Sequence, residues 1–242
     1  MPIRAIAFDA YGTLYDVQSV RSRAIELCGE KGELITQLWR LKQLEYSWLH
    51  SLMRDYQDFW SITRSALDFS LASVGVEPEP VLCDALMEKY FQLDLYPEAV
   101  EALDALSGHT MVIFSNGSPL MLERLIAASG VAGRFADLIS VDRAKCFKPD
   151  PAAYALVEQS LGIPAAETLF VSSNGFDIAG AKCFGFPVAR IARTDGTPPP
   201  ATAQIAPGEL YRLLRGQAEQ LGYAADWTVR RLTDLPALLA GS

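Results

Sequence analysis

Polar side chains that could carry out chemistry recur directly after short β-prone runs of the sequence. Asp9 follows the first such run, and Ser115-Asn116-Gly117 closes the second. Lys148 lies near the third, and residues 172–177 close the fourth. Ligands of a parallel sheet bind beyond the carboxyl ends of its strands, so we expect these residues to meet at one edge. A carboxylate, a lysine, hydroxyls and amides gathered there are the groups that nucleophilic and acid–base chemistry use.

The elements that would position these groups alternate between strands and helices. Strands are predicted at residues 3–8, 111–115, 138–141, 168–172 and 188–191. One intervening helix is predicted to begin at Ser118-Pro119 and end near Gly130, and another to begin at Asp150-Pro151 and end at Gly162. The alternation predicts an α/β fold with a doubly wound, Rossmann-like parallel sheet.

Residues 17–95 interrupt this alternation. They lack convincing strands and carry helical apolar patterns instead, of which the longest contains Leu34, Leu38, Leu41, Leu44, Trp48 and Leu52. We therefore expect a helical cap subdomain at residues 17–95, inserted into an α/β core formed by residues 1–16 and 96–242. The Thr197-Pro198-Pro199-Pro200 patch is interpreted as a surface loop.

Composition excludes several classes of function. The 242 residues carry a formal net charge of −8, and no Lys/Arg cluster is longer than a pair, so neither nucleic acid nor an anionic membrane is an expected partner. The first strand begins almost at the initiator Met, and apolar runs are shorter than the roughly 18 residues of a membrane span. Four dispersed cysteines and only two histidines indicate reduced thiols rather than a metal site. We expect a cytoplasmic protein.

The order of these motifs resembles the haloacid dehalogenase superfamily over nearly the whole predicted core. In that superfamily a nucleophilic Asp follows the first strand, a Ser or Thr the second, a Lys lies near the third and acidic residues follow the fourth. Asp9, Ser115, Lys148 and Asp177 stand at these places. Any one of the motifs alone would more simply be a turn, but four in order are hard to explain by coincidence.

Two positions depart from the phosphatases of the superfamily. Phosphatases usually carry a second Asp, a general acid, where this chain has Tyr11, and an acidic Mg²⁺ ligand where it has Ser173. A halide leaves without a proton, and a monoanionic carboxylate can be held by hydrogen-bond donors and one Lys instead of a hard cation. The departures therefore favour carbon–halogen cleavage with no metal and no other cofactor.

Together, D-A-Y-G-T-L, S-N-G, F-K-P and V-S-S-N-G-F-D look like the type II L-2-haloacid dehalogenases, and residues 38–46 resemble their cap. The resemblance implies that Asp9 attacks C2 of a short L-2-haloalkanoic acid with inversion, and that water then hydrolyses the aspartyl ester to release a D-2-hydroxy acid. It assigns the halide cradle to Arg40, Asn116 and Phe176. Leu44 and Phe59 are candidates for the apolar wall. By itself, Arg40 would more simply be a solvated helix arginine.

The remaining roles implied by the resemblance concern the substrate carboxylate and the nucleophile. The substrate carboxylate is expected to be held by Ser115, by Lys148 and by backbone amides near Tyr11. Lys148 is also expected to keep Asp9 ionised. Asp177 either polarises the hydrolytic water or is a structural partner of Lys148. The expected supporting residues are Thr13, Ser172, Asn174 and Tyr154.

Two other functions stay open at this point. One is a phosphatase or phosphonatase of the same fold, which Tyr11 and Ser173 disfavour, and the other is a non-catalytic member that binds small acids, which the intact Asp9 and Lys148 disfavour. The resemblance also implies a homodimer, with a 2-haloacid and the released halide as its small-molecule partners.

Overall fold

A six-stranded sheet forms the centre of the computed structural model, which describes residues 2–194, 206, 209, 213 and 217–240. Neighbouring strands are parallel, in the order β5-β4-β1-β6-β7-β8. Their bounds are β1 Ala5–Phe8, β4 Thr110–Ser115, β5 Asp137–Ser140, β6 Thr168–Ser172, β7 Val188–Ile191 and β8 Trp227–Val229. The chain runs outward from β1 to β4 and β5 and then crosses to β6, so the topology reverses beside β1.

The predicted α/β fold is confirmed, and all five predicted strands are present with ends within two residues of the prediction. The sixth strand, β8, was missed. It contains three residues at the edge of the sheet, too few to establish an alternating pattern in the sequence. The predicted surface loop at residues 197–200 lies outside the described residues.

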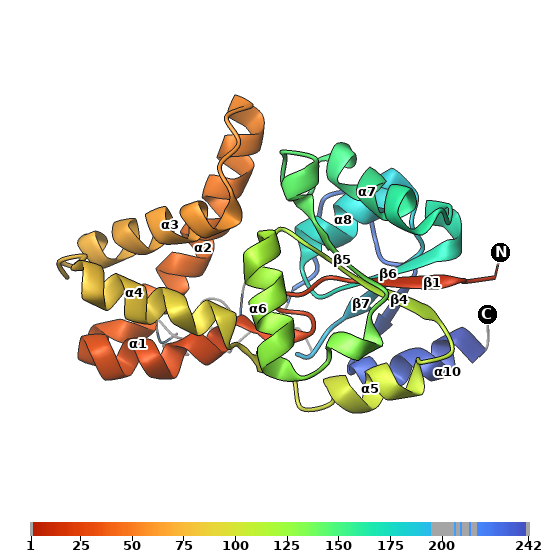
Figure 1. Cartoon of the computed structure of the whole chain (residues 1–242), viewed down its shortest axis with the longest axis horizontal. Coiled ribbons are helices and arrows are strands. Elements are labelled where there is room, and N and C mark those ends of the chain that lie inside the picture. Colours follow the sequence, from red (N-terminus) through yellow and green to blue (C-terminus); the bar gives the residue numbers. More distant parts are fainter. Residues whose placement is uncertain (1, 195–205, 207–208, 210–212, 214–216, 241–242) are drawn as a thin grey trace.

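Helices cover both faces of the sheet. In Figure 1, α5 (Ala99–Ala105) and α10 (Leu235–Ala240) lie on one face and α7 (Pro151–Leu161) and α8 (Gly175–Phe184) on the other, while α6 (Pro119–Ser129) packs against β5. The two predicted helix starts are confirmed. Ser118 and Asp150 accept hydrogen bonds from backbone amides of α6 and α7. Both helices end at a glycine in the left-handed region.

The interval between β1 and α5 folds into four α-helices that lie beside the sheet (Figure 1). They are α1 (Val20–Cys28), α2 (Gly32–Met53), α3 (Phe59–Ser73) and α4 (Pro80–Glu88). Where the chain leaves and rejoins the sheet region, β2 (Tyr15–Asp16) pairs antiparallel with β3 (Asp94–Leu95). Both crossings are therefore tied together close to Asp9.

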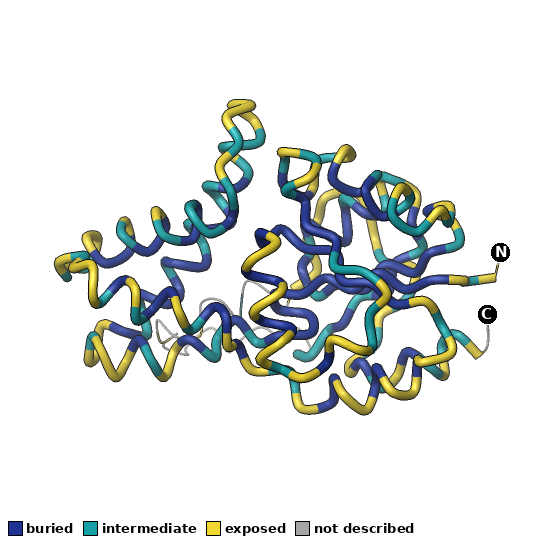
Figure 2. The backbone as a smooth tube through the Cα atoms, in the orientation of Figure 1, coloured by how far each residue is buried: buried dark blue, intermediate teal, exposed yellow. Residues whose placement is uncertain are grey.

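The buried face of α2 is not the apolar stripe predicted from the sequence. Of that stripe only Leu44 is buried, and Leu52 is 79% exposed. The buried positions of α2 are Gly32, Ile35, Thr36, Gln37, Trp39, Arg40, Gln43, Leu44 and Ser47. The prediction failed because this face packs on α3 and the site through hydrogen-bonded polar side chains, which a hydrophobic pattern cannot register. Figure 2 shows buried residues along the strands and the inner sides of the helices.

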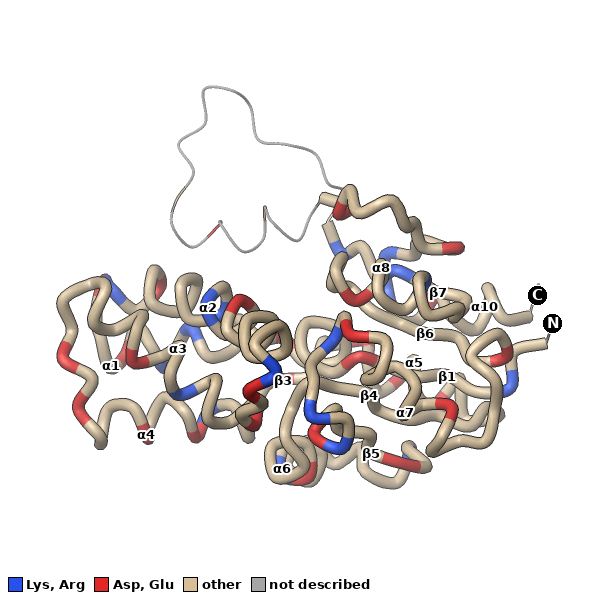
Figure 3. Tube along the Cα trace, turned by 90° about the horizontal axis from the view of Figure 1, so that it is seen from above, with Lys and Arg blue, Asp and Glu red and all other residues tan. Residues whose placement is uncertain are grey.

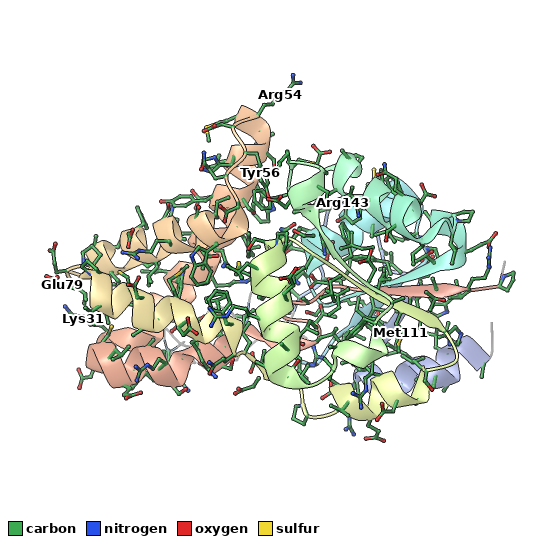
Figure 4. The ribbon with its side chains drawn as sticks, viewed as in Figure 1. Lys31, Arg54, Tyr56, Glu79, Met111 and Arg143 are labelled. Atoms are coloured by element: carbon green, nitrogen blue, oxygen red, sulfur yellow. The ribbon has the colours of Figure 1, made fainter. Side chains whose placement is uncertain are left out.

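The helical part contacts the sheet domain through the end of α2 and the loop that follows it. The Tyr56 hydroxyl donates to Asp142 Oδ1 at 2.9 Å, and its ring stacks on Phe147 with a centroid distance of 5.1 Å. Figure 4 shows Tyr56 on the side of the helical part that faces the segment carrying Arg143. The backbone amide of Phe147 also donates to Ser51 Oγ at 2.9 Å. These contacts join α2 to the residue that precedes Lys148.

Charge is spread over the surface rather than gathered on one face. Acidic and basic residues are interspersed along both parts of the chain in Figure 3. Among the described residues, no helix has the length and apolar character needed to cross a membrane.

Candidate active site

A small cavity lies where the carboxyl ends of β1, β4 and β6 meet α2 and α3. Every residue lining it was named as a candidate from the sequence: Asp9, Tyr11, Arg40, Leu44, Phe59, Ser115, Asn116, Lys148, Asn174, Phe176 and Asp177. The remaining candidates, Thr13, Ser172 and Tyr154, do not line the cavity but bond to residues that do. The fold therefore brings the whole predicted set together.

Asp9 is buried at the end of β1 and is surrounded by donors. Its Oδ2 accepts from Thr13 Oγ1 and from Asn174 Nδ2, both at 2.8 Å, and more distantly from Ser172 Oγ at 3.5 Å. Its Oδ1 accepts from Lys148 Nζ at 3.2 Å. Oδ2 is thus occupied by neutral donors, whereas Oδ1 keeps lone pairs free. Such an arrangement fixes the carboxylate with one oxygen available for chemistry.

Lys148 links the two buried carboxylates. Its Nζ also donates to Asp177 Oδ2 at 3.0 Å, and both side chains are 1% exposed. Tyr154 donates to Asp177 Oδ1 at 2.8 Å. Burial is the largest influence on Asp177 and raises its pKa to about 6, with Lys148 opposing the rise and Asp9 adding to it. Asp177 can therefore exchange a proton near neutral pH.

The loops after β4 and β6 present further polar atoms to the cavity. Asn116 Oδ1 accepts from the Lys148 backbone amide at 3.0 Å, which joins the loop after β4 to the lysine. Ser115 Oγ accepts from the Gly117 amide at 3.1 Å. Asn174 Nδ2 also donates to the Tyr11 carbonyl at 3.0 Å. These bonds join the loop after β4 to the segment that carries Lys148, and the loop after β6 to the loop after β1.

The cation from α2 is held differently. Arg40 is 3% exposed and donates through Nη1 to Gln43 Oε1 at 2.5 Å. Among the described residues, no carboxylate forms an ion pair with Arg40, and its buried Nε has no hydrogen-bond partner. A buried guanidinium without a counter-charge is costly in a protein and lies ready to receive an anion. The interpretation of Arg40 as an ordinary solvated arginine is therefore wrong.

Aromatic and aliphatic side chains close the remaining walls. Leu44 and Phe59 come from α2 and α3, and Tyr11 packs between Phe59 and Tyr90 with ring centroids about 6 Å apart. The Tyr11 hydroxyl is buried and has no hydrogen-bond partner among the residues that the structure describes, and burial raises its pKa far above the ordinary value. Phe176 meets Trp48 edge-to-face at 5.3 Å. The cavity thus combines a polar floor from the sheet with apolar walls from the helices.

Two residues that were not predicted from the sequence, Ser173 and Arg193, hold the loop that follows Asp9. Ser173 Oγ donates to the Gly12 carbonyl at 2.6 Å, and the Ser173 amide donates to Thr13 Oγ1 at 3.0 Å. Arg193 donates to the Gly12 and Thr13 carbonyls at 3.2 and 2.7 Å, and lies over Tyr96. Arg193 follows a predicted strand by two residues. Its position beyond a strand end could therefore have identified it as a candidate for the site.

Two more missed residues, Gln43 and Thr63, connect α2 and α3. Gln43 Nε2 donates to Thr63 Oγ1 at 2.7 Å, and both residues are fully buried. Their sequence signal is weak, since an isolated Gln or Thr in a helix is ordinarily exposed. Among the described residues, no group of three or more His, Cys, Asp or Glu side chains is placed to hold a metal ion.

Comparisons with known proteins agree with this geometry. The chain is 47% identical to an (S)-2-haloacid dehalogenase of Xanthobacter autotrophicus, over 99% of this chain and 96% of the relative. It is 43% identical to (S)-2-haloacid dehalogenase 4A of Burkholderia cepacia, over 81% of this chain and 86% of that protein.

Among solved structures, the chain is similar to that of the L-2-haloacid dehalogenase from Xanthobacter autotrophicus with chloropropionic acid covalently bound. The TM-score is 0.93 and the identity 46%, with 99% of each chain covered. A family model of haloacid dehalogenase-like hydrolases matches residues 3–185. With this match, and with the motifs assembled at one sheet edge, the chain belongs to the haloacid dehalogenase-like hydrolase family.

Proposed function

We propose that this protein is an (S)-2-haloacid dehalogenase, which hydrolyses short L-2-haloalkanoic acids to D-2-hydroxy acids. The observation that carries the proposal is one small cavity that holds a buried carboxylate, Asp9, and a buried guanidinium, Arg40, that forms no ion pair with any residue described in the structure. A displacement on a haloacid needs a nucleophile on one side and a receptor for an anionic leaving group on the other. The relatives described above have this activity in their names, and one was solved with chloropropionic acid bound covalently.

In the first step, Asp9 Oδ1 forms a bond to C2 as the carbon–halogen bond breaks, and the halide leaves with the bonding electrons. Oδ1 is the better nucleophile of the two oxygens because it has a single donor, Lys148, whereas Oδ2 receives bonds from Thr13 and Asn174. Attack from the side opposite the halogen inverts C2. The ester that results links Asp9 to the substrate carbon.

In the second step, water adds to the carboxyl carbon of Asp9 and gives up a proton. The bond between that carbon and Oδ1 then breaks, and Oδ1 leaves on C2, takes up the proton and becomes the hydroxyl oxygen of the product. The carbon–oxygen bond at C2 stays intact, so the inverted configuration persists. We assign the activation of this water to Asp177. Two observations support the assignment: Asp177 lines the cavity, and its pKa, raised to about 6, suits a general base. Lys148 and Tyr154 orient the carboxylate through its two oxygens.

Substrate binding is divided between the strand-end loops and the helices. Ser115, the backbone near Tyr11 and Lys148 receive the substrate carboxylate, and Arg40, Asn116 and Phe176 receive the halogen. Leu44 and Phe59 contact the alkyl group. The burial of these groups around one cavity supports the division, because pre-placed donors in a water-poor site stabilise developing charge by about 3 kcal/mol each.

We also propose a domain division, an oligomeric state and a cellular compartment for the protein. Residues 17–95 act as a cap on a core of residues 1–16 and 96–242, supported by the β2–β3 pair where the chain crosses between them. Exposed Leu49, Leu52 and Met53 at the end of α2 support a homodimer. All four cysteines are free thiols, which favours a reducing compartment such as the cytoplasm.

The test is incubation of the purified protein with L- and D-2-chloropropionate separately, in the presence of EDTA. Halide release is followed with product chirality. Chloride from the L form alone, with D-lactate as product, is the expected result. Release of no halide from either form contradicts the proposed function, and release that EDTA abolishes contradicts the metal-independent mechanism.

A further inference from the structure

We propose that Gln43 and Thr63 are positioning residues that hold Arg40 toward the departing halide through a neutral acceptor, so that the guanidinium keeps its charge for that anion. The inference rests on the proposed function and adds two residues to its halide site. Neither residue lines the cavity, and both act through Arg40.

The hydrogen bonds run in one direction from α3 to the guanidinium. The single hydroxyl proton of Thr63 is donated to the Phe59 carbonyl at 2.6 Å, so Thr63 Oγ1 must accept from Gln43 Nε2. This bond fixes which way the Gln43 amide faces. Its Oε1 is then directed at Arg40 Nη1, 2.5 Å away. Without Thr63, the amide could turn its NH₂ group toward the cation.

The helix that carries Thr63 is itself held at this point. Trp39 Nε1 donates to the Thr63 carbonyl at 2.8 Å, so α2 and α3 are joined by two hydrogen bonds around one residue. The Thr63 hydroxyl donates to the backbone carbonyl of Phe59, whose side chain lines the cavity. The same short network therefore connects Arg40 to the helix that supplies an apolar wall of the site.

The neutrality of Gln43 is the decisive property. A Glu at this position has the same size but would form a buried ion pair with Arg40, and a guanidinium satisfied by a carboxylate attracts a second anion weakly. Lys148, the other cation that lines the cavity, is paired with carboxylates instead: its Nζ lies within 3.2 Å of both Asp9 and Asp177. Arg40 is thus the cation of the cavity that is left uncompensated among the described residues.

The experiment measures halide binding and leaving-group dependence in the full-length protein. Bromide dissociation constants are obtained by titrating tryptophan fluorescence at constant ionic strength, and kcat is compared for L-2-bromo- and L-2-chloropropionate. For Gln43→Glu we expect bromide affinity to fall about tenfold or more, since one tenfold step corresponds to about 1.4 kcal/mol. The ratio of kcat for the bromo over the chloro substrate should rise, because chloride is the poorer leaving group.

Three further variants separate positioning from folding. Thr63→Val removes the acceptor for Gln43 and should weaken bromide binding about threefold to tenfold. Thr63→Ser keeps the hydroxyl and should restore the affinity. Thr36→Val is the matched control, because Thr36 is also buried and also donates to a backbone carbonyl four residues back, but it makes no bond to Gln43. It should leave bromide binding and the kcat ratio unchanged.

The outcomes distinguish the inference from the proposed function. If the wild-type protein binds bromide but Gln43→Glu and Thr63→Val bind it within twofold of wild type, the inference is overturned and the dehalogenase function stands. If Thr36→Val loses as much as Thr63→Val, the effect is general packing and the inference is again overturned. If the wild-type protein releases no halide from haloacids, the proposed function fails, and the bromide titrations still decide whether Gln43 controls an anion site. If Gln43→Glu does not fold, the comparison of Thr63→Val with Thr63→Ser decides.

Discussion

The two halves of the candidate site treat charge in opposite ways. On the side of the sheet, the charged groups form a paired cluster: the single cation, Lys148, contacts both Asp9 and Asp177, and both carboxylates receive further hydrogen bonds from neutral donors. We call this the matched half of the site. On the side of the helices, within the part of the chain that the structure describes, Arg40 has one neutral hydrogen-bond acceptor and a buried Nε without a partner. We expect the matched half to hold the reacting groups in place and the unmatched half to bind an anion that forms during the reaction.

The comparison also explains why different elements supply the two halves. Strand ends of a parallel sheet are fixed by hydrogen bonds on both sides, which suits a nucleophile that must not move. The helices reach the cavity through Arg40, Leu44 and Phe59. If the proposed roles hold, the sheet supplies the reacting groups and the helices supply the halide receptor and the apolar wall.

Replacing the nucleophile should have the largest effect. Asp9→Asn is expected to lower kcat by about four orders of magnitude or more, because a neutral amide cannot form the ester. Mass spectrometry of the wild-type protein after a single turnover in ¹⁸O-water should find the label in Asp9. If the label appears only in the hydroxy acid, direct attack by water replaces the ester mechanism.

Replacing Lys148 should mainly reduce stability, whereas replacing Arg40 should mainly reduce activity. Lys148→Met leaves two buried carboxylates without their counter-charge and should destabilise the fold by about 3–5 kcal/mol. Arg40→Met removes a buried charge that has no counter-charge, so stability should stay equal or increase while kcat falls about 10²- to 10³-fold. Urea unfolding and steady-state kinetics on both variants measure these effects. A loss of stability in Arg40→Met as large as in Lys148→Met contradicts the comparison.

The matched half should also impose a pH dependence through Asp177. Burial raises its pKa from 3.8 to about 6, so kcat should fall as pH decreases through about 6, where the proposed base becomes protonated. The folded state binds this proton more tightly than the unfolded chain, so the stability contributed by Asp177 is full below about pH 4 and decreases by up to about 3 kcal/mol as pH rises to about 6.

Asp177→Asn provides the check on that stability term. Denaturant unfolding of wild type and Asp177→Asn at several pH values between 4 and 7 measures it. If the difference in unfolding free energy between wild type and Asp177→Asn stays constant from pH 4 to 7, the pKa of Asp177 is not raised by burial. The pH dependence of kcat is measured on the wild type alone, because Asp177→Asn lacks the proposed base.

The smallest effect is expected from the apolar wall on the helical side. Leu44→Ala enlarges the cavity and should raise the kcat/KM of L-2-chlorobutanoate relative to L-2-chloropropionate about threefold to tenfold, since one methylene group is worth about 1–3 kcal/mol of discrimination. Leu67→Ala is the control, because Leu67 is buried in α3 but does not line the cavity. It should lower stability and leave this ratio unchanged. Equal ratios in both variants would remove Leu44 from the substrate wall.

The sequence predicted the α/β sheet, the helical character of the interval between β1 and α5, and every residue that lines the cavity. This was possible because strand ends of a parallel sheet converge on one edge, and because the motifs after those strands have a recognisable order. It did not predict β8, because three residues at a sheet edge do not establish a pattern. It also did not predict the hydrogen bonds of Ser173 and Arg193 to the loop after Asp9, because a place beyond a strand end indicates the sheet edge but not the bonding partner.

Only the tertiary structure decided how the charge in the site is distributed. Arg40 is the same residue whether it is solvated, paired with an acid or held by an amide, and the difference depends on which side chains of α2 and α3 meet across their contact. Gln43 and Thr63 are 20 residues apart in the sequence, and their hydrogen bond exists only after the two helices pack. The residue types available for catalysis are local properties of the chain, but the uncompensated charge on Arg40 is a property of the packed arrangement, because burial and pairing are defined by neighbours distant in sequence.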